Sequence, residues 1–362
     1  MKGMRWAMVM VAVAATVISA GLTVAQAAGP AANPARFQPE AVSFVSPAIG
    51  FVLGTEGCPP GQACRVHLRA TADSGTRWHA VAAPDVRLGG GGRAGSARVG
   101  AVLFASRDVG WLYGPGLWVT RDGASRWRRI GAPGAILAMT VASGRAYAIV
   151  LPAGGSSSEL FSSPVGTNRW RHVGRTTGNA EAVLAASGRT AWFGSVTGLT
   201  ATVWRVTAGT RVRKFRFACA GTSYFLTSIA AATPSRVAFL CTNTADFNTA
   251  SEGIEVMLSV NGGRTERLTG RKAPVIGDGG VLAAPPGPGT VLTFATSVGN
   301  PSWIGRSADD GRTWKRVAYF ASGGGSPGSL SYVTRLVGFV VLGGTRLLRT
   351  TDAGRSWHQV RI

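Results

Sequence analysis

Acidic residues are scarce in this 362-residue sequence. It contains 16 Asp and Glu against 38 Lys and Arg, which gives a formal net charge of +22 at pH 7. Lysine is scarce too, so arginine carries nearly all of the positive charge. Two interpretations stay open: affinity for anionic surfaces such as cell-wall polymers, acidic polysaccharide, lipid head groups or nucleic acid, or the Ala-, Gly- and Arg-rich coding of a GC-rich genome.

Several motifs of catalysis and cofactor binding are missing. The glycine stretch Gly89–Gly92 is followed neither by Gly-Lys-Ser/Thr nor by a long helix, which excludes a phosphate-binding loop. After residue 27 there is no long segment with a 3.6-residue apolar period and capping residues. These absences favour an all-β protein without a cofactor.

A long apolar run occurs only at the N-terminus. Lys2 and Arg5 precede an uncharged apolar run over Trp6–Val24, and Ala25-Gln26-Ala27 fits an A-x-A cleavage site. This layout predicts a secretory signal peptide over residues 1–27, whose removal leaves a net charge of +20. An uncleaved membrane anchor is the alternative, because the run is nearly long enough to span a bilayer. We expect a protein that is secreted, extracellular or associated with the cell wall, and that contacts a membrane only if the signal is uncleaved.

Cysteine is limited to Cys58, Cys64, Cys219 and Cys241. An even count in an exported chain favours disulfides. Three pairings are possible, and we predict neighbour pairing, Cys58 with Cys64 and Cys219 with Cys241, because it closes short local loops. A tetrahedral zinc site would need clustered spacing such as C-x₂-C, which the sequence lacks. No metal is therefore predicted.

One eight-residue phrase recurs along the chain. Ser307–Trp314 and Thr350–Trp357 both read Ser/Thr-x-Asp-x-Gly-x-Thr/Ser-Trp, and Thr71–Trp78 departs only at the penultimate hydroxyl. These residue types predict a tight hairpin turn, in which the Asp accepts backbone N–H groups, the hydroxyls satisfy other turn groups and Gly takes a positive φ. The Trp begins the next strand and buries its ring between sheets. We interpret the Asp and Trp of each copy as structural rather than catalytic.

The phrase resembles the Asp-box, or BNR repeat, of sialidases, xyloglucanases, sortilin-type receptors, the photosystem II stability/assembly factor family and other propellers of the WD, YVTN and BNR type. The resemblance implies a β-propeller blade at each copy and covers most of the mature chain. It does not choose among those families, because they share the motif and differ in function. Since the assembly factors are binding proteins, the resemblance implies a scaffold or assembly role.

Degenerate copies of the phrase fill the intervals between the clear ones. In the second copy Gly123 sits one place early, and the third copy has Val165 in place of Asp. The fourth copy is reduced to Thr207–Thr210. The fifth copy has Asn261 for Asp and Glu266 for Trp. The repeat therefore continues through the middle of the chain in a weakened form.

The spacing of the copies predicts the architecture. The Asp position falls near residues 73, 122, 165, 209, 261, 309 and 352, so 279 residues span six intervals, a mean of 46.5. A period of about 40–50 residues with four short strands is typical of propeller blades. We predict an all-β fold, a single seven-bladed β-propeller of four-stranded antiparallel blades over residues 41–362, after an extended lead-in over residues 28–40. The predicted structural Asp-box residues are Asp73, Trp78, Asp122, Trp127, Asn261, Asp309, Trp314, Asp352 and Trp357.

No catalytic or metal-binding residue is assigned. A glycosidase needs two carboxylates close together, but the loop carboxylates lie in different blades and share no local motif: Glu56, Asp85, Glu181, Asp246, Glu252 and Asp278. The Arg-Ile-Pro phrase of sialidases is absent, and none of the five Tyr residues has a neighbouring acid. His79, His172 and His358 come just after the box Trp of different blades and are not expected to converge on a metal.

The densest basic cluster surrounds one predicted outer strand, residues 211–217. Its members, here called the basic stripe, are Arg205, Arg211, Arg213, Lys214 and Arg216. Alternation places Arg211 and Arg213 on one side of the strand, and the parity of the basic residues changes at Lys214. The stripe is either a solubilising edge strand, whose charge blocks edge-to-edge pairing, or an anion-binding surface.

These features predict an exported, non-enzymatic binding or scaffold propeller. The expected partner is an anionic polysaccharide, a cell-wall or other cell-surface polymer, or a protein; no specific nucleic acid is expected. We expect a monomer without cofactors. A secreted glycoside hydrolase of the sialidase or xyloglucanase type is the alternative.

Overall fold

The structure is a computed structural model that describes most of the chain after residue 36. The described residues are 37–59, 62–89, 96–155, 157–175, 182–197, 200–207, 211–217, 219, 224–243, 254–271, 280–297, 301–321, 327–342 and 344–362. The predicted signal peptide and nearly all of the predicted lead-in lie outside these residues. So do four of the acidic loop residues weighed above: Glu181, Asp246, Glu252 and Asp278.

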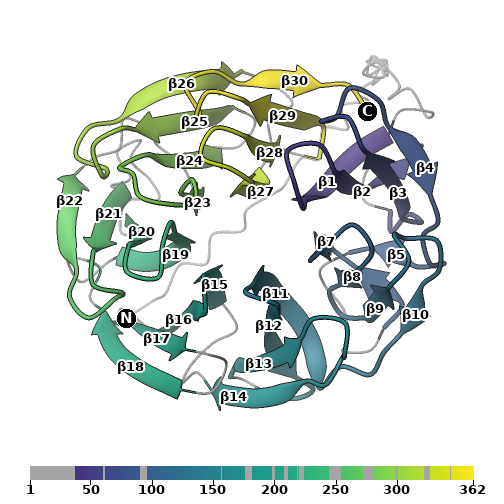
Figure 1. Cartoon of the computed structure of the whole chain (residues 1–362), viewed down its shortest axis with the longest axis horizontal. Coiled ribbons are helices and arrows are strands. Elements are labelled where there is room, and N and C mark those ends of the chain that lie inside the picture. The colour runs from purple at the N-terminus through teal and green to yellow at the C-terminus, as the bar shows by residue number, and fades with distance from the viewer. Residues whose placement is uncertain are drawn as a thin grey trace, which may run out of the picture.

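Within the described residues, seven four-stranded antiparallel sheets stand as blades around a central axis (Figure 1). Each blade consists of four strands that are consecutive in the sequence, with the first strand next to the axis and the fourth at the outer edge. The prediction of an all-β, seven-bladed propeller is therefore confirmed. No helix in the described part of the chain is long and apolar enough to cross a membrane.

The strands of the first three blades are β1 (Phe37–Phe44), β2 (Gly50–Glu56), β3 (His67–Thr71) and β4 (His79–Val81); β7 (Ala101–Phe104), β8 (Gly110–Tyr113), β9 (Leu117–Thr120) and β10 (Arg128–Arg129); and β11 (Gly134–Ala142), β12 (Arg145–Pro152), β13 (Glu159–Pro164) and β14 (Arg171–Arg175). The fourth and fifth blades contain β15 (Ala182–Ser187), β16 (Thr190–Thr197), β17 (Thr200–Thr207) and β18 (Arg211–Phe217); and β19 (Tyr224–Ala231), β20 (Val237–Asn243), β21 (Ile254–Ser259) and β22 (Arg267–Arg271). The last two contain β23 (Gly280–Ala283), β24 (Leu292–Ser297), β25 (Ser302–Ser307) and β26 (Lys315–Phe320); and β27 (Pro327–Tyr332), β28 (Gly338–Leu342), β29 (Arg346–Thr350) and β30 (His358–Val360).

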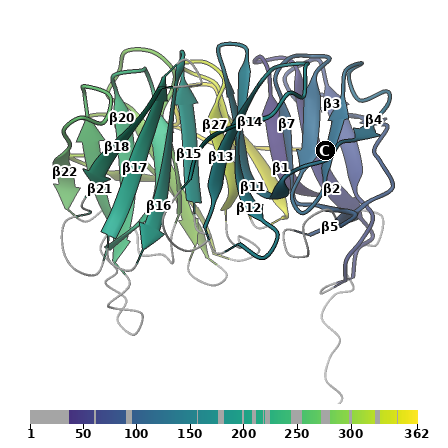
Figure 2. The same cartoon turned by 90° about the horizontal axis from the view of Figure 1, so that it is seen from below.

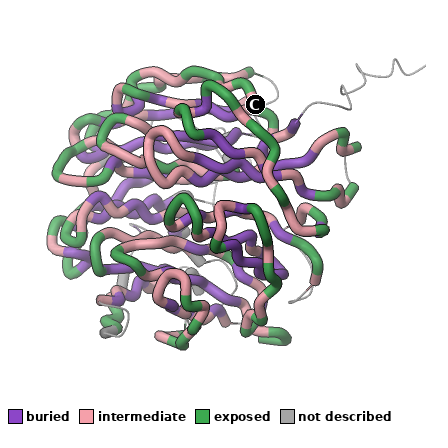
Figure 3. The backbone as a smooth tube through the Cα atoms, turned by 45° about the vertical axis from the view of Figure 1, so that its right-hand side comes forward, coloured by how far each residue is buried: buried purple, intermediate pink, exposed green. Residues whose placement is uncertain are grey.

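The middle strands of a blade are deeply covered, because a neighbouring blade packs on each of their faces. All residues of β9 and β28 are buried, and Figure 3 shows exposure concentrated in turns and at outer edges. Phe37, at the start of β1, is also buried and packs in the cluster between the first and last blades. The first blade therefore begins before residue 41, where the lead-in was expected to end.

Among the described strands, no blade borrows a strand from the opposite end of the chain, so the first and last blades close the ring through side-chain packing. Phe44 at the end of β1 stacks on Phe339 of β28, with ring centroids 3.5 Å apart. Phe51 of β2 and Phe104 of β7 make the same stacked contact between the first and second blades. The closing interface thus repeats the geometry of an internal one.

A second repeated phrase produces these stacked pairs. An aromatic residue is followed two places later by Ser or Thr and six places later by Gly, as in Phe44-x-Ser46-x₃-Gly50 and Phe104-x-Ser106-x₃-Gly110. The hydroxyl of Ser46 accepts the N–H of Ile49 at 3.0 Å, which forms the turn. A Cβ on Gly50 would lie 2.4 Å from the ring of Phe44, so only glycine leaves room for that ring.

Two sets of connections share one face of the ring, here called the turn face. They are the turns between third and fourth strands, which hold the box phrases, and the connections between first and second strands. In six blades a backbone N–H of the first set donates to a carbonyl of the second: Ser74 to Ala48, Gly123 to Asp108, Val165 to Gly144, Gly262 to Ser235, Asp310 to Thr290 and Ala353 to Leu336. Figure 2, which views the ring from the side, shows how the strands run between the two faces.

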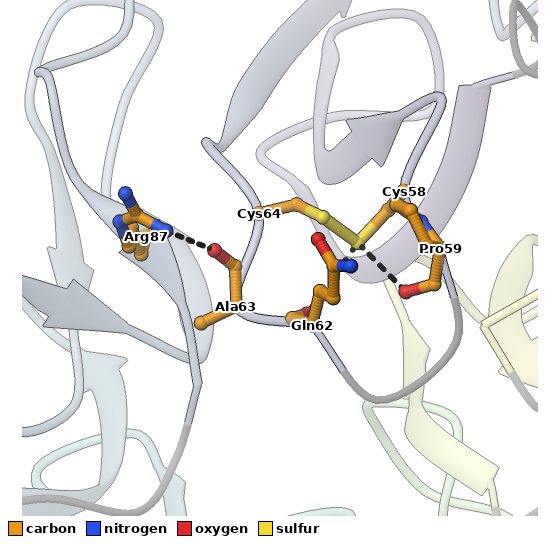
Figure 4. Close-up of a disulfide and its surroundings, with 6 residues drawn as sticks. All are labelled: Cys58, Pro59, Gln62, Ala63, Cys64 and Arg87. Atoms are coloured by element: carbon orange, nitrogen blue, oxygen red, sulfur yellow. Dashed lines mark hydrogen bonds between the residues drawn. A yellow bond between two sulfur atoms is a disulfide. The ribbon is translucent and has the colours of Figure 1, made fainter.

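Both predicted disulfides are present. Cys58–Cys64 closes the connection between β2 and β3, and Cys219–Cys241 ties the connection before β19 to β20. Near the first disulfide the guanidinium of Arg87 donates to the carbonyl of Ala63 at 2.8 Å (Figure 4). Arg87 belongs to β5 (Arg87–Leu88), which pairs in parallel with β6 (Arg98–Val99). The first disulfide therefore supports a loop that packs against the connection between the first two blades.

Candidate anion-binding surface

The Asp of each clear box phrase lies inside a turn. In the seventh blade Asp352 accepts the N–H of Ser356 at 3.0 Å and its hydroxyl at 2.6 Å, and the hydroxyl of Thr350 accepts the N–H of Gly354. Asp309 makes the corresponding bonds to Thr313 and Asp73 accepts the N–H of Arg77. Burial acts to raise the pKa of Asp352, but the bonds from Ser356 outweigh it and lower the pKa to about 2.

The degenerate phrases of the second and fifth blades form the same turn. In the second blade Gly123 and Ala124 have φ of 66° and 68°, and Ala124 donates its N–H to the hydroxyl of Thr120. Asp122 accepts bonds from the side chain and N–H of Arg126, which lower its pKa to about 2. In the fifth blade Asn261 accepts the N–H of Thr265 and donates its Nδ2–H to that residue's hydroxyl. Neither the early glycine nor the loss of the carboxylate abolishes the turn.

The tryptophans of the box phrases stabilise the turns through indole hydrogen bonds and ring contacts. Trp78 and Trp314 donate their indole N–H to the carbonyls of Gly75 and Gly311 in their own turns. Trp127 donates instead to Ala82, in the connection that leaves the first blade, at 2.8 Å. Trp357 contributes an edge-to-face contact with Tyr332. These positions have packing and hydrogen-bonding roles within the fold.

Other described carboxylates pair with arginines. Glu56 contacts Arg69 at 2.8 Å, Asp85 contacts Arg65 at 2.9 Å, Glu159 contacts Arg175 at 2.6 Å, and Asp310 pairs with Arg236. The pKa of Glu40, which sequence reasoning did not single out, is raised by burial. In the described part of the chain no group of three or more His, Cys, Asp or Glu is placed to hold a metal ion.

The basic stripe is divided between the two faces of the fourth blade. β17 and β18 pair without a register shift, so Arg205 lies opposite Arg213 while Trp204 lies opposite Lys214. Directly opposed residues share a face. The two groups are separated by the sheet itself. The side chains of Arg211 and Arg216 lie outside the described part of the structure.

Arg205, Arg213 and Arg264 form a cationic cluster, here called the rim cluster, where the fourth and fifth blades meet. Arg205 lies against Gly262, so its face of the fourth blade meets the turn of the fifth. Burial, followed by the charges of Arg264 and Arg213, lowers the pKa of Arg205. Figure 1 shows β18 and β22 as neighbouring outer strands at this place. Among the described residues, no carboxylate pairs with any of the three.

The other side of the stripe is different in character. The ammonium of Lys214 lies 5.9 Å from the centre of the Trp204 ring, a cation–π contact on the face toward the third blade. Trp204 in turn stacks on Phe193, in the core shared by the third and fourth blades. Lys214 therefore covers an aromatic core residue, whereas the rim cluster gathers like charges.

Arg264 was missed by sequence reasoning. It belongs to the degenerate fifth phrase, and four strands separate it from Arg205 in the sequence. Only the contact between the fourth and fifth blades brings the two residues together. The available signal was its place in a turn that lacks the box Asp. Asn261 carries no charge there, so the box position itself adds no carboxylate beside Arg264.

Comparisons with known proteins support the fold. A Ycf48 structure bound to D1 peptide is 18% identical, with a TM-score of 0.57, and the match covers 88% of this chain and 94% of that one. Ycf48 from Cyanidioschyzon merolae is 16% identical, with a TM-score of 0.59 and coverage of 89% and 97%. An ancestral GH74 enzyme is 11% identical, with a TM-score of 0.59, and the match covers 91% of this chain and 47% of that one. No protein-family model and no curated protein matches the sequence.

Proposed function

We propose that this protein is an exported, non-enzymatic binding or scaffold propeller of the Asp-box type that holds an anionic partner. The observation that carries the proposal is the rim cluster, where three arginines gather and no described carboxylate forms an ion pair with any of them. Guanidinium groups packed together repel one another, and an anion bound between them offsets that repulsion. The arginine-rich composition of the chain supports the same conclusion.

The partner is an acidic protein segment or an anionic polymer of the cell wall or extracellular space. The likeness to Ycf48, one structure of which holds a peptide, supports a protein partner. The net charge supports either kind. The N-terminal layout supports export as a secreted or wall-associated protein.

The test is retention of the mature protein on resins that carry heparin, teichoic acid or poly-glutamate, measured against salt. A rim variant would carry Arg213→Glu, Arg264→Glu and Arg205→Gln. Because bound counterions are released on association, the wild type should elute at high salt and the rim variant much earlier. A matched control on the second blade, Arg107→Glu, Arg121→Glu and Arg128→Gln, makes the same change in net charge and should elute close to the wild type.

Two results would refute the proposal. An equal loss of retention in the rim variant and the control would show that attraction follows net charge. The basic stripe would then serve only to block edge-to-edge pairing of the outer strand. No retention of the wild type on any of the three resins at about 0.15 M salt would remove anion binding. Among the three resins, the one that holds the protein best identifies the class of partner.

A further inference from the structure

The connection between the third and fourth strands of the fourth blade is short. Residues 208–210 join β17 to β18, whereas the corresponding turns of the first, fifth and sixth blades occupy residues 72–78, 260–266 and 308–314. Those longer turns pack onto the preceding blade, where their glycines lie close to a side chain: Gly75 to Val360, Gly263 to Trp192 and Gly311 to Val256.

Tyr147 of β12 marks the place that such a turn would reach. In the second and fourth blades an indole points at the next blade's turn: Trp111 donates to Asn168 and Trp192 donates to the carbonyl of Gly262 at 3.2 Å. Tyr147 occupies the third blade's face toward the fourth and is fully buried with Phe193. Its hydroxyl and the Nε of nearby Arg145 have no hydrogen-bond partner among the described residues.

A surface pocket lies at this place on the third blade. Three arginines line it, together with two hydroxyls and one imidazole: Arg145, Arg169, Arg171, Ser162, Thr167 and His172. The guanidinium of Arg145 donates to the hydroxyl of Ser162 at 3.0 Å, and Ser162 lies directly opposite Arg171 in the sheet. The sheet therefore fixes two cationic side chains and a hydroxyl around one opening.

The pocket carries an excess of positive charge. Its lining includes no carboxylate. The nearest acid, Glu159, is engaged by two nitrogens of Arg175 at 2.9 and 2.6 Å, and it also lies 3.8 Å from His172. From the fourth blade, Arg189 lies close enough to Tyr147 to act electrostatically on its hydroxyl. An anion in the pocket would therefore be attracted by several cations, and no lining carboxylate would compete with it for them.

We propose that this pocket binds a tetrahedral oxyanion, namely a phosphate or sulfate group. Guanidinium groups donate paired N–H bonds to the oxygens of such anions. A planar carboxylate needs only one guanidinium fork, whereas three arginines supply donors from several directions, which matches three or four oxygens. The inference deepens the proposed function and rests on it, because one anionic group of the partner would enter here.

Calorimetric titration of the mature protein at fixed ionic strength tests this inference. The probes are inorganic phosphate, inorganic sulfate and glycerol 3-phosphate. The wild type should bind phosphate or sulfate saturably at one site. Arg145→Gln with Arg171→Gln should weaken that binding by about tenfold or more, equivalent to about 1.4 kcal/mol per factor of ten. The control Arg107→Gln with Arg121→Gln, on the second blade, should bind like the wild type.

The relative affinities of the probes distinguish an esterified ligand from a free ion. Tighter binding of glycerol 3-phosphate than of inorganic phosphate identifies an esterified group as the ligand, and the reverse identifies the free ion. Absence of saturable binding by the inorganic anions, or equal affinity in the pocket variant and its control, overturns the inference. If the double variant does not fold, Arg169→Gln, which changes one exposed side chain, takes its place.

The rim variant distinguishes this inference from the proposed function. It leaves the pocket intact and should still bind inorganic phosphate. Conversely, if the pocket fails while the wild type is retained on a polyanion resin, the proposed function stands without this site. Retention on resin and titration with small anions therefore report on different residues.

Discussion

Phe44 and Phe339 stack face to face and join the first blade to the last, with their rings 3.5 Å apart and nearly parallel. Both blades are complete without exchange of a strand, so this contact and the apolar cluster around it hold the ring closed. Phe339 is fully buried. The same stacked pair at the first internal junction, Phe51 with Phe104, provides a comparison within one molecule.

Phe339→Ala should therefore destabilise the propeller as severely as Phe51→Ala. Removing a buried phenyl ring costs about 3–5 kcal/mol, because apolar transfer and cavity terms add. Urea denaturation of the two variants and of Val260→Ala, a change at an exposed side chain, measures the effect. A small loss for Phe339→Ala beside a large one for Phe51→Ala would show that the closing interface is weaker than an internal one.

Tyr147, which is fully buried, and Tyr332, which is half-buried, provide a pair of phenols for comparison. The hydroxyl of Tyr332 bonds to that of Thr293 across a blade junction at 2.8 Å, whereas that of Tyr147 has no partner among the described residues. Tyr332→Phe should therefore cost about 1–2 kcal/mol, and Tyr147→Phe should be neutral or stabilising. Thermal melting of both variants checks this. A loss for Tyr147→Phe equal to that for Tyr332→Phe would reveal a partner for the Tyr147 hydroxyl.

The stability of the seventh turn should depend on pH in the acid range. The folded-state pKa of Asp352 is about 2 and lies below the unfolded value, so the folded state binds fewer protons there. Its contribution is therefore fully present above the unfolded pKa of about 4 and is lost as pH falls toward 2. Asp352→Asn should keep the turn, as Asn261 does in the fifth blade, and should show a shallower loss of melting temperature below pH 4. Identical acid profiles for the variant and the wild type would contradict this assignment.

The two disulfides should contribute unequally. Cys219 and Cys241 are 22 residues apart and buried, whereas Cys58 and Cys64 are 6 apart in a loop. Loop-closure entropy makes the longer crosslink worth about 1 kcal/mol more. Replacing each pair by Ala and comparing urea midpoints tests the difference. A larger loss for the Cys58–Cys64 pair would mean that its contacts with the neighbouring connection outweigh chain entropy.

Local residues determined the blades. The turn phrases recur with nearly constant spacing, and each turn is satisfied by atoms within a few residues, as with Asp309 and Thr313. Such bonds depend little on the rest of the fold, so the sequence predicted the blade count and the neighbour pairing of the cysteines. The second phrase, with Phe44 and Gly50, is also present in the sequence. Its role was not predicted, because the ring on which Phe44 stacks belongs to another blade.

Contacts between blades were decided by the tertiary structure alone. Alternation along the strand already separated Lys214 from Arg213, but only strand pairing set Arg205 opposite Arg213, and Arg264 comes from the next blade. The pocket at Arg145 likewise depends on strand pairing, which sets Ser162 opposite Arg171. Blade geometry follows from short-range hydrogen bonds that a sequence displays, whereas the charge pattern of the rim follows from strand register and from packing between segments that are distant in the chain.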